Sequence, residues 1–252
     1  MLREMRTDIV TRLRQAGCVF AEDEAELLIS AARSAEELDA MVGRRVAGLP
    51  LEQVVGWAEF CGLRIAVEPG VFVPRRRTEF LARQAAALAK PGDVVVDLCC
   101  GAGAIAAAVA GLVPGVDVHA SDIDPVAVRC ARRNVPGQVY QGDLFDPLPA
   151  RLRGRVAVLT ANVPYVPASE IGLLPAEARA HEPLVALDGG QDGLEVLRRV
   201  AAGAPDWLAA GGYLLTETSE RQLPAAVEAS AGLSARAVRE PDLDAVVVIY
   251  QN

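Results

Sequence analysis

The stretch that decides the fold is residues 94–106, with the sequence VVVDLCCGAGAIA. It begins with a short apolar run rich in valine, which is typical of a buried strand. Gly101 and Gly103 follow at once, and glycine lets a chain turn sharply and approach a ligand closely. The alanine-rich end predicts a helix, whose first N–H groups have no partner within the helix. This strand, turn and helix predict one half of a nucleoside-binding site.

Outward from this unit, apolar β-branched runs alternate with helical patterns. Such alternation indicates βαβ units and an α/β fold with a mostly parallel, doubly wound, Rossmann-like sheet. The apolar run at the end of the chain, AVVVIY (residues 245–250), follows the strand-like SARAVRE (residues 234–240) after a short link. These two segments are therefore predicted to form an antiparallel hairpin at the edge of the sheet. The other runs are VDVHAS, AVLTAN and YLLTE (residues 116–121, 157–162 and 213–217), and the helical patterns cover residues 78–88, 104–110, 125–133 and 194–208.

The glycine turn is compatible with two kinds of nucleoside cofactor. Asp122 ends the next strand about 20 residues on, where a carboxylate can accept hydrogen bonds from ribose hydroxyls. Gly101, Gly103 and Ala106 also match the pattern G-x-G-x-x-G/A of dinucleotide-binding proteins. A nicotinamide-dependent oxidoreductase is therefore an alternative at this point.

Two further carboxylates bear on the choice of cofactor. Asp97 lies just before the glycine turn, where it would repel a pyrophosphate but suit the ammonium and sulfonium groups of S-adenosylmethionine. The alternative for Asp97 is a cap on the turn. Asp143, after the third strand, is a candidate acceptor for the adenine amino group, and its alternative is turn chemistry ahead of Pro147.

The N-terminal part of the chain follows a different pattern. Apolar residues recur at helical spacing over about 50 residues, and Ser34 followed by Glu37 is a capping-box signature. Residues 58–70 (AEFCGLRIAVEPG) indicate two short strands with Cys61 and Gly62 at their turn. We therefore expect a helical part and a hairpin ahead of the α/β part.

Composition and charge exclude several classes of protein. A formal net charge of −8 does not suit a general nucleic-acid binder, which needs clustered positive charge. The five cysteines form no C-x-x-C pair, so we expect neither a metal site nor a disulfide scaffold. Residues 98–116 carry no charge, but their glycines and Pro114 indicate a turn and a buried helix, not a membrane span. With no signal-peptide pattern, the expected location is cytoplasmic.

Residues 160–167 (TANVPYVP) carry the most specific chemistry. They follow the fourth strand and resemble the Asn-Pro-Pro-Tyr motif of methyltransferases that act on planar amide or amino nitrogens. The resemblance implies that Asn162 and the Val163 carbonyl accept hydrogen bonds from the target NH₂. It also implies that Tyr165 packs against the flat target group. Pro164 keeps the second proline of the motif, whereas Val163 replaces the first.

Two longer stretches resemble the HemK-type release-factor glutamine methyltransferases. They are EFCGLRIAVEPGVFVPRRRTEFL (residues 59–81) and HEPLVALDGGQDGLEVLRRV (residues 181–200). The resemblance implies a helical substrate-recognition domain (1–55), a hairpin linker (56–76) and a class I methyltransferase domain with a seven-stranded sheet (77–252). It implies S-adenosylmethionine as cofactor and, as protein substrate, the Gly-Gly-Gln loop of a translation release factor.

Alternative functions remain, and the sequence departs from the family pattern at one further place. An adenine-N6 methyltransferase shares the motif chemistry, but the acidic balance and 4% aromatic residues do not favour a nucleic-acid surface. An oxidoreductase or a non-catalytic nucleoside-binding module fits the glycine turn but not Asn162 in its motif. Arg76 and Arg77 depart from the proline and acidic residue usual in the family. Together with Val163, they leave another protein substrate open, although the arginine run 75–77 is interpreted as a solvated turn.

Overall fold

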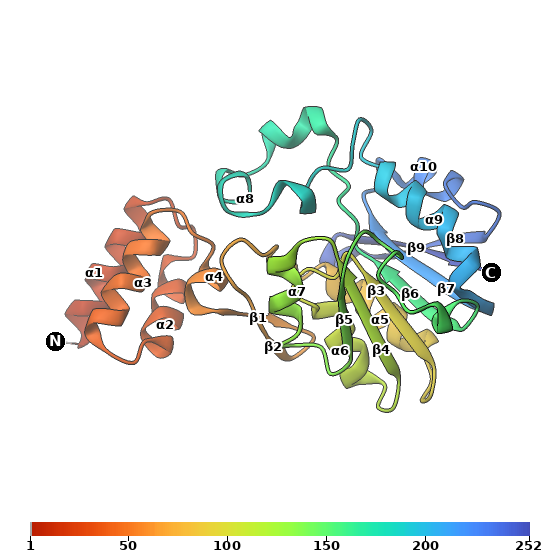
Figure 1. Cartoon of the computed structure of the whole chain (residues 1–252). Coiled ribbons are helices and arrows are strands. Elements are labelled where there is room, and N and C mark those ends of the chain that lie inside the picture. The colour runs from red at the N-terminus through yellow and green to blue at the C-terminus, as the bar shows by residue number, and fades with distance from the viewer. Residues whose placement is uncertain (1) are drawn as a thin grey trace.

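The computed structural model describes residues 2–252 and contains a seven-stranded sheet with helices on both faces (Figure 1). The strand order is β5-β4-β3-β6-β7-β9-β8. Strands β3 to β7 pair in parallel, and β9 pairs antiparallel with both β7 and β8. The predicted parallel sheet and edge hairpin are thus confirmed. The strands are β3 Val94–Leu98, β4 Asp117–Asp122, β5 Gln138–Gln141, β6 Val156–Ala161, β7 Leu208–Thr218, β8 Ser234–Glu240 and β9 Ala245–Gln251.

Two hydrophobic cores lie on the two faces of the sheet. Helices α5 (Thr78–Leu88), α6 (Ala104–Leu112) and α7 (Pro125–Ala131) pack on one face. Helices α9 (Glu195–Trp207) and α10 (Leu223–Glu228) pack on the other. The uncharged residues 98–116 form the end of β3, a turn and the buried helix α6, as predicted. Within residues 2–252, no helix is both long and apolar enough to cross a membrane.

The order of the strands creates the crevice that holds the site. From β3 the chain first adds β4 and β5 on one side, and then returns to add β6 and β7 on the other. The connections that follow β3 and β6 therefore leave the sheet in opposite directions. In open α/β sheets, ligands bind at such a switch point, outside the carboxyl ends of the strands.

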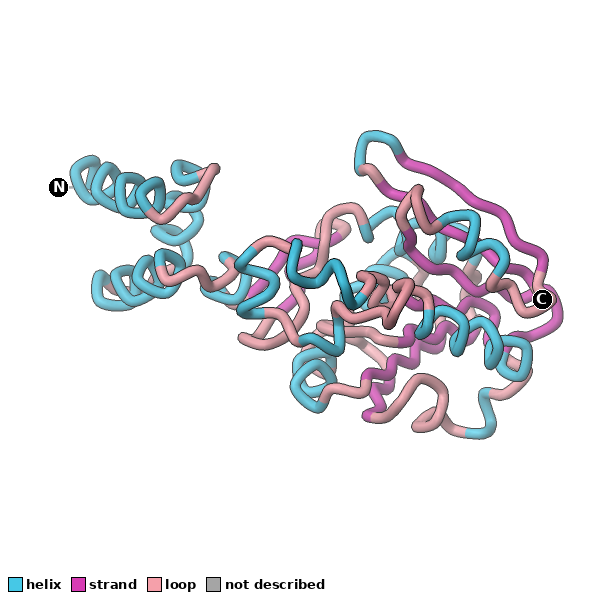
Figure 2. The backbone as a smooth tube through the Cα atoms, turned by 90° about the horizontal axis from the view of Figure 1, so that it is seen from above, coloured by secondary structure: helices cyan, strands magenta, loops and turns pink. Residues whose placement is uncertain are grey.

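The N-terminal helices form a bundle with a core of its own. Figures 1 and 2 show it at one end of the molecule, joined to the rest through a hairpin. One half of the predicted capping box is confirmed, since the Ser34 hydroxyl accepts the Glu37 N–H at 3.1 Å. The Glu37 carboxylate accepts the N–H of Arg33 at 2.8 Å and not that of Ser34. Cys61 and Gly62 have φ angles of 50° and 75°, which suit the tight turn of a two-residue hairpin. The elements are α1 Leu2–Gln15, α2 Ala21–Ala31, α3 Ala35–Val46, α4 Leu51–Val55, β1 Trp57–Phe60 and β2 Leu63–Ala66.

Residues 167–187, here named the flap, leave the sheet after β6 and return before α9. They contain η2 (Ala168–Leu173), α8 (Ala176–His181) and η3 (Leu184–Ala186), and Figure 1 shows α8 standing away from the sheet. A bridge between Val166 and Asp188 closes the base of the flap. Its far part contacts the N-terminal bundle, where Arg45 pairs with Glu177 at 2.7 Å. The flap is thus held at both ends.

Candidate active site

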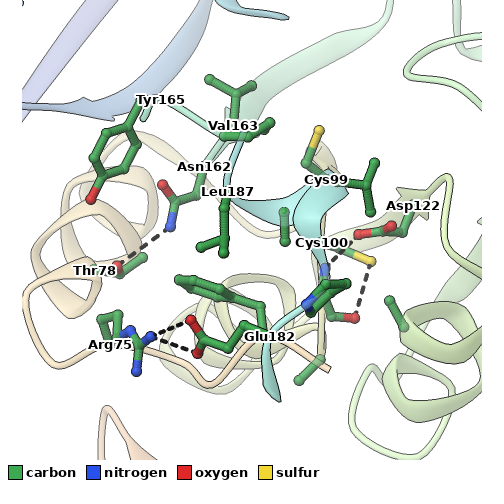
Figure 3. A pocket seen from close by; sticks show the side chains of 18 of the residues that line it. Arg75, Thr78, Cys99, Cys100, Asp122, Asn162, Val163, Tyr165, Glu182 and Leu187 are labelled. Atoms are coloured by element: carbon green, nitrogen blue, oxygen red, sulfur yellow. Dashed lines mark hydrogen bonds and ion pairs between the residues drawn. The ribbon is translucent and has the colours of Figure 1, made fainter. Parts of the chain in front are cut away.

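A cavity of about 720 Å³ lies at the carboxyl ends of the parallel strands, between these ends and the flap (Figure 3). Its volume is in the range of small-molecule sites. One part is lined by residues after β3, β4 and β5, and the other by the segment after β6 and the start of α5. In residues 2–252, no three His, Cys, Asp or Glu side chains are grouped so that they could hold a metal ion.

Asp122 and Gly101 meet in the first part of the cavity. The Asp122 carboxylate accepts the Gly101 N–H at 2.8 Å and the Asp124 N–H at 2.9 Å, so it fixes the glycine turn. Burial raises the pKa of the Asp122 carboxyl, and these two N–H groups oppose that shift. Each carboxylate oxygen accepts more than one hydrogen bond, so Asp122 can still receive ribose hydroxyls. Asp124 also caps α7, as its side chain accepts the Val126 N–H.

Gly103 and Asp97 lie behind the wall of the cavity. A Cβ on Gly103 would lie 2.5 Å from a methyl group of Val135, so this glycine is needed for packing. Asp97 is 1% exposed and accepts the Thr160 hydroxyl at 2.8 Å and the Ala106 N–H at 3.3 Å. Burial raises the pKa of Asp97 to about 7. These bonds fit the capping alternative, and contact of Asp97 with a cofactor ammonium stays a prediction.

Asp143 lines the cavity together with a residue that the sequence did not single out. Arg199, from α9, pairs with the Asp143 carboxylate at 2.5 Å. The pair occupies only one of the two carboxylate oxygens in this contact. Asp143 can therefore still accept a hydrogen bond from an adenine amino group, as the sequence predicts.

Cys99 and Cys100 also line the cavity beside Asp122. Burial raises the pKa of both thiols well above the ordinary value, and the neighbouring carboxylates raise them further. The thiols are therefore protonated at neutral pH, and the reactive form of cysteine is the thiolate. Cys99 and Cys100 therefore act as small apolar side chains in the cavity wall, not as nucleophiles.

The motif residues Asn162, Val163, Pro164 and Tyr165 all line the second part of the cavity. Asn162 follows directly after β6, and its Nδ2 lies 3.5 Å from the hydroxyl of Thr78 at the start of α5. The other amide atom, Asn162 Oδ1, is buried and has no hydrogen-bond partner within the described chain. A buried polar atom without a partner is uncommon and costs about 1–3 kcal/mol. Asn162 Oδ1 is thus free to accept an N–H from a ligand, and that role stays a prediction.

Tyr165 is fixed from both its backbone and its side chain. Its carbonyl accepts a hydrogen bond from Gln222 at 2.9 Å, and its hydroxyl accepts one from Arg77. Burial raises the pKa of the phenol, so it stays neutral. The Arg77 guanidinium also lies 5.8 Å from the ring centre. The ring is therefore held at the edge of the cavity, where a flat group can pack against it.

The interpretation of the arginine run as a solvated turn holds only in part. Arg76 and Arg77 form an exposed turn, but Arg75 and Arg77 also form ion pairs with buried carboxylates. Arg75 pairs with Glu182 at 2.5 Å, and the Glu182 side chain is only 1% exposed. Arg77 pairs with Glu217 at 2.8 Å, and the Glu217 side chain is 3% exposed. All four residues line the cavity. The partners are more than 100 positions apart in the sequence, so no local pattern could reveal them.

The residues present fit S-adenosylmethionine. Asp122 and Asp143 line the cavity as carboxylates that can accept from ribose and adenine, which stays a prediction, and Gly101 lies at the wall with open space where a Cβ would be. The unpartnered Asn162 Oδ1 lies in the wall of the same cavity, where a group that receives the methyl would need an acceptor. A nucleoside and a flat target group can thus be bound next to each other.

This fold and this site define a class I S-adenosylmethionine-dependent methyltransferase. A family model described as methyltransferase small domain matches residues 62–165. The solved structure of a methyltransferase from Pyrococcus furiosus is similar with a TM-score of 0.59 and 18% identity. That similarity covers 83% of this chain and 98% of the other, and it supports the fold alone.

Curated relatives define the family more closely. The release factor glutamine methyltransferase of Gloeobacter violaceus is 38% identical over 230 residues, which are 85% of this chain and 79% of the relative. Alignments with other relatives of that name span 63% to 67% of the relatives' own length. The 4-amino-L-phenylalanine/4-methylamino-L-phenylalanine methyltransferase of Streptomyces pristinaespiralis is 40% identical over 194 residues, 72% of this chain and 65% of that protein.

The chain belongs to the release factor glutamine methyltransferase family. The resemblance inferred from the sequence is therefore confirmed, and with it S-adenosylmethionine as the cofactor of this family. The comparisons do not favour the nicotinamide-dependent oxidoreductase or the adenine-N6 methyltransferase.

Proposed function

We propose that this protein methylates the side-chain amide nitrogen of a glutamine in the Gly-Gly-Gln loop of a translation release factor. The observation that carries the proposal is the buried oxygen of Asn162, which lies in the cavity wall and has no donor among residues 2–252. A primary amide supplies such a donor, and the curated relatives named as release factor glutamine methyltransferases support this substrate.

The chemistry required of the protein is positioning. An amide nitrogen is a weak nucleophile because its lone pair is delocalised into the carbonyl group. Asn162 Oδ1 and the Val163 carbonyl accept the two N–H bonds, which directs the remaining lone pair toward the methyl group. They also stabilise the positive charge that develops on nitrogen, which disappears when the methylated amide releases one N–H proton to water. When bound, S-adenosylmethionine supplies the electrophilic methyl group on its sulfonium.

Thr78 is a positioning residue in this scheme. It is 4% exposed, and it lies on the Nδ2 side of the Asn162 amide. An amide held through its nitrogen presents its oxygen to the cavity. The motif alone does not predict this contact, because Thr78 lies 84 positions before Asn162.

The charged side chains near Asn162 and Tyr165, at the end of the cavity where the target group would bind, suit a neutral group. Arg75 is balanced by Glu182, and Arg77 by Glu217, at distances of 2.5 and 2.8 Å. A carboxylate or an ammonium entering this end would add an unpaired charge to a partly buried site. A carboxamide adds none.

The N-terminal bundle is the proposed recognition domain for the protein substrate, with the division 1–55, 56–76 and 77–252. Arg45, only 12% exposed, joins Glu24 of the bundle to Glu177 of the flap. A protein bound to the bundle would thus contact an element connected to the cavity wall. A release factor is used in translation, so the proposal places the enzyme in the cytoplasm, with protein and not nucleic acid as its partner.

Mass spectrometry of the release factor tests the proposal. After incubation with enzyme and S-adenosylmethionine, the tryptic peptide with Gly-Gly-Gln should gain one methyl group on glutamine. A release factor with Ala in place of that Gln should gain none. Labelled cofactor in a cell extract provides the wider search. Label on another protein would show that the substrate is a different protein, with the same chemistry. Label on DNA or RNA would instead indicate an adenine-N6 methyltransferase.

A further inference from the structure

Glu217 is a second free acceptor in the cavity, and the proposed reaction does not use it. It lies near the end of β7, lines the cavity and has a side chain that is 3% exposed. Its Oε1 accepts a hydrogen bond from Arg77 Nε at 2.8 Å. Its Oε2 is buried without a partner in residues 2–252, as is Asn162 Oδ1. Native proteins leave few buried acceptors unpaired, so two in one cavity wall indicate donors that arrive with a ligand.

The two free oxygens belong to neighbouring strands. Strands β6 and β7 are parallel, with Thr160 opposite Leu215. Continued by two residues, this register places Asn162 beside Glu217. The start of α5 contacts both, because Thr78 lies 3.5 Å from Asn162 Nδ2 and the residue before it pairs with Glu217. Asn162 and Glu217 therefore belong to the same end of the cavity.

Arg77 determines which kind of donor suits Glu217. Its guanidinium neutralises the carboxylate and also donates to the Tyr165 hydroxyl, so it is fixed at two points. Because the pair is neutral, an ammonium donor would meet Arg77 with an unbalanced charge. A carboxylate brings no donor at all. A neutral N–H group satisfies Oε2 without adding charge.

We propose that Glu217 is a substrate-binding residue whose Oε2 accepts a hydrogen bond from a backbone N–H next to the methylated glutamine. This inference rests on the proposed function. The target amide uses both of its N–H bonds on Asn162 and on the Val163 carbonyl, so the donor for Glu217 is the adjoining backbone. The two glycines that precede the glutamine leave their N–H groups uncovered by side chains. Glu217 thereby distinguishes a glutamine within a peptide from a free amide.

Calorimetric titration of the protein loaded with S-adenosylhomocysteine tests the inference, with a synthetic peptide containing Gly-Gly-Gln as the probe. Glu217→Gln is the informative variant, because its carbonyl can still accept from Arg77 while its amide nitrogen replaces Oε2. The free acceptor thus becomes a donor at unchanged size. Glu217→Met removes both acceptors. The control is Glu220→Gln, an exposed residue paired with Arg239 outside the cavity.

The peptide should bind Glu217→Gln about 10- to 100-fold more weakly than the parent protein, the scale for a hydrogen bond to a charged group. Affinity for S-adenosylhomocysteine should be unchanged in each variant, which also shows that the fold is intact. If Glu217→Gln binds the peptide as tightly as the parent protein, the inference is overturned, whether or not Glu217→Met loses affinity. Glu217 would then serve only to hold Arg77 in place. A parent protein that fails to bind the peptide would overturn the proposed substrate as well.

Discussion

Asn162 is the residue on which the proposed reaction depends most. Replacing it with alanine removes the oriented Oδ1 acceptor and leaves Asp122 and Gly101 untouched. We expect Asn162→Ala to lower kcat by roughly 100-fold or more, the scale for one positioned hydrogen-bonding group, with nearly unchanged affinity for S-adenosylhomocysteine. Thr78→Val should lower kcat less, because the amide keeps its oxygen but loses a contact that orients it. Steady-state kinetics measure both, and parent-like turnover of Asn162→Ala would remove this residue from the mechanism.

Asp97 should make the stability of the protein depend on pH. Burial raises its pKa from 3.8 to about 7, so the folded protein retains a proton that the unfolded chain loses. The resulting stability is present below about pH 4 and is lost as the pH rises through 7. Asp97→Asn imitates the protonated form, with Thr160 and Ala106 as partners.

The free energy of unfolding of Asp97→Asn relative to the parent should therefore grow between pH 4 and pH 7 and then level off. The gain should be on the order of a few kcal/mol, since one pKa unit corresponds to about 1.4 kcal/mol. Urea unfolding at several pH values measures it, and a difference independent of pH would contradict the prediction. Titration with S-adenosylhomocysteine separately tests the predicted ammonium contact, which requires weaker binding by the variant.

The turn between β3 and α6 contains two glycines with different requirements. Both have positive φ angles, 54° at Gly101 and 78° at Gly103. A methyl group on Gly103 would collide with Val135, whereas one on Gly101 meets no atom within 4 Å. Gly103→Ala should thus destabilise the protein by about 1–3 kcal/mol, and Gly101→Ala by less.

The effect on ligand binding should be reversed between these two variants. Gly101 lines the cavity and Gly103 does not, so Gly101→Ala should weaken S-adenosylhomocysteine binding more than Gly103→Ala does. Thermal unfolding and calorimetric titration provide the two measurements. Equal losses of affinity and stability in both variants would show that the turn acts as one unit.

The elements that the sequence predicted well are those set by short-range patterns. The strand residues 234–240 and the helix Thr78–Leu88 agree with the structure at both ends, because alternation and helical spacing are local properties. The Cys61–Gly62 turn is equally local. The ion pairs of Arg77 with Glu217 and of Arg45 with Glu177 join residues 140 and 132 positions apart, so they follow from the folded arrangement alone. The same holds for the burial of Asp97.

At the scale of the whole molecule, Arg45 connects the N-terminal bundle to the flap. It is largely buried and bonds Glu24, Glu177 and the Leu49 carbonyl. Arg45→Met should raise KM for the protein substrate several-fold, because the flap and the bundle lose their shared charged partner. Affinity for S-adenosylhomocysteine should be unchanged. Arg12→Met is the matched control, since Arg12 pairs with Asp39 at the exposed surface of the bundle. Equal KM values for the two variants would contradict a role of this connection in recognition.

The closed base of the flap has a consequence for how such a protein can change over evolution. Val166 and Asp188 lie side by side, and the Gly189 N–H donates to the Val166 carbonyl at 2.9 Å, so the two ends of the flap lie next to each other. The entropy of closing a loop grows only slowly with its length. Insertions and deletions in the flap that keep Glu177 and Glu182 with their arginine partners should therefore alter the cavity wall at little cost to the sheet. We expect substrate specificity to respond to the length of this segment, and designed libraries that vary its length can measure that response.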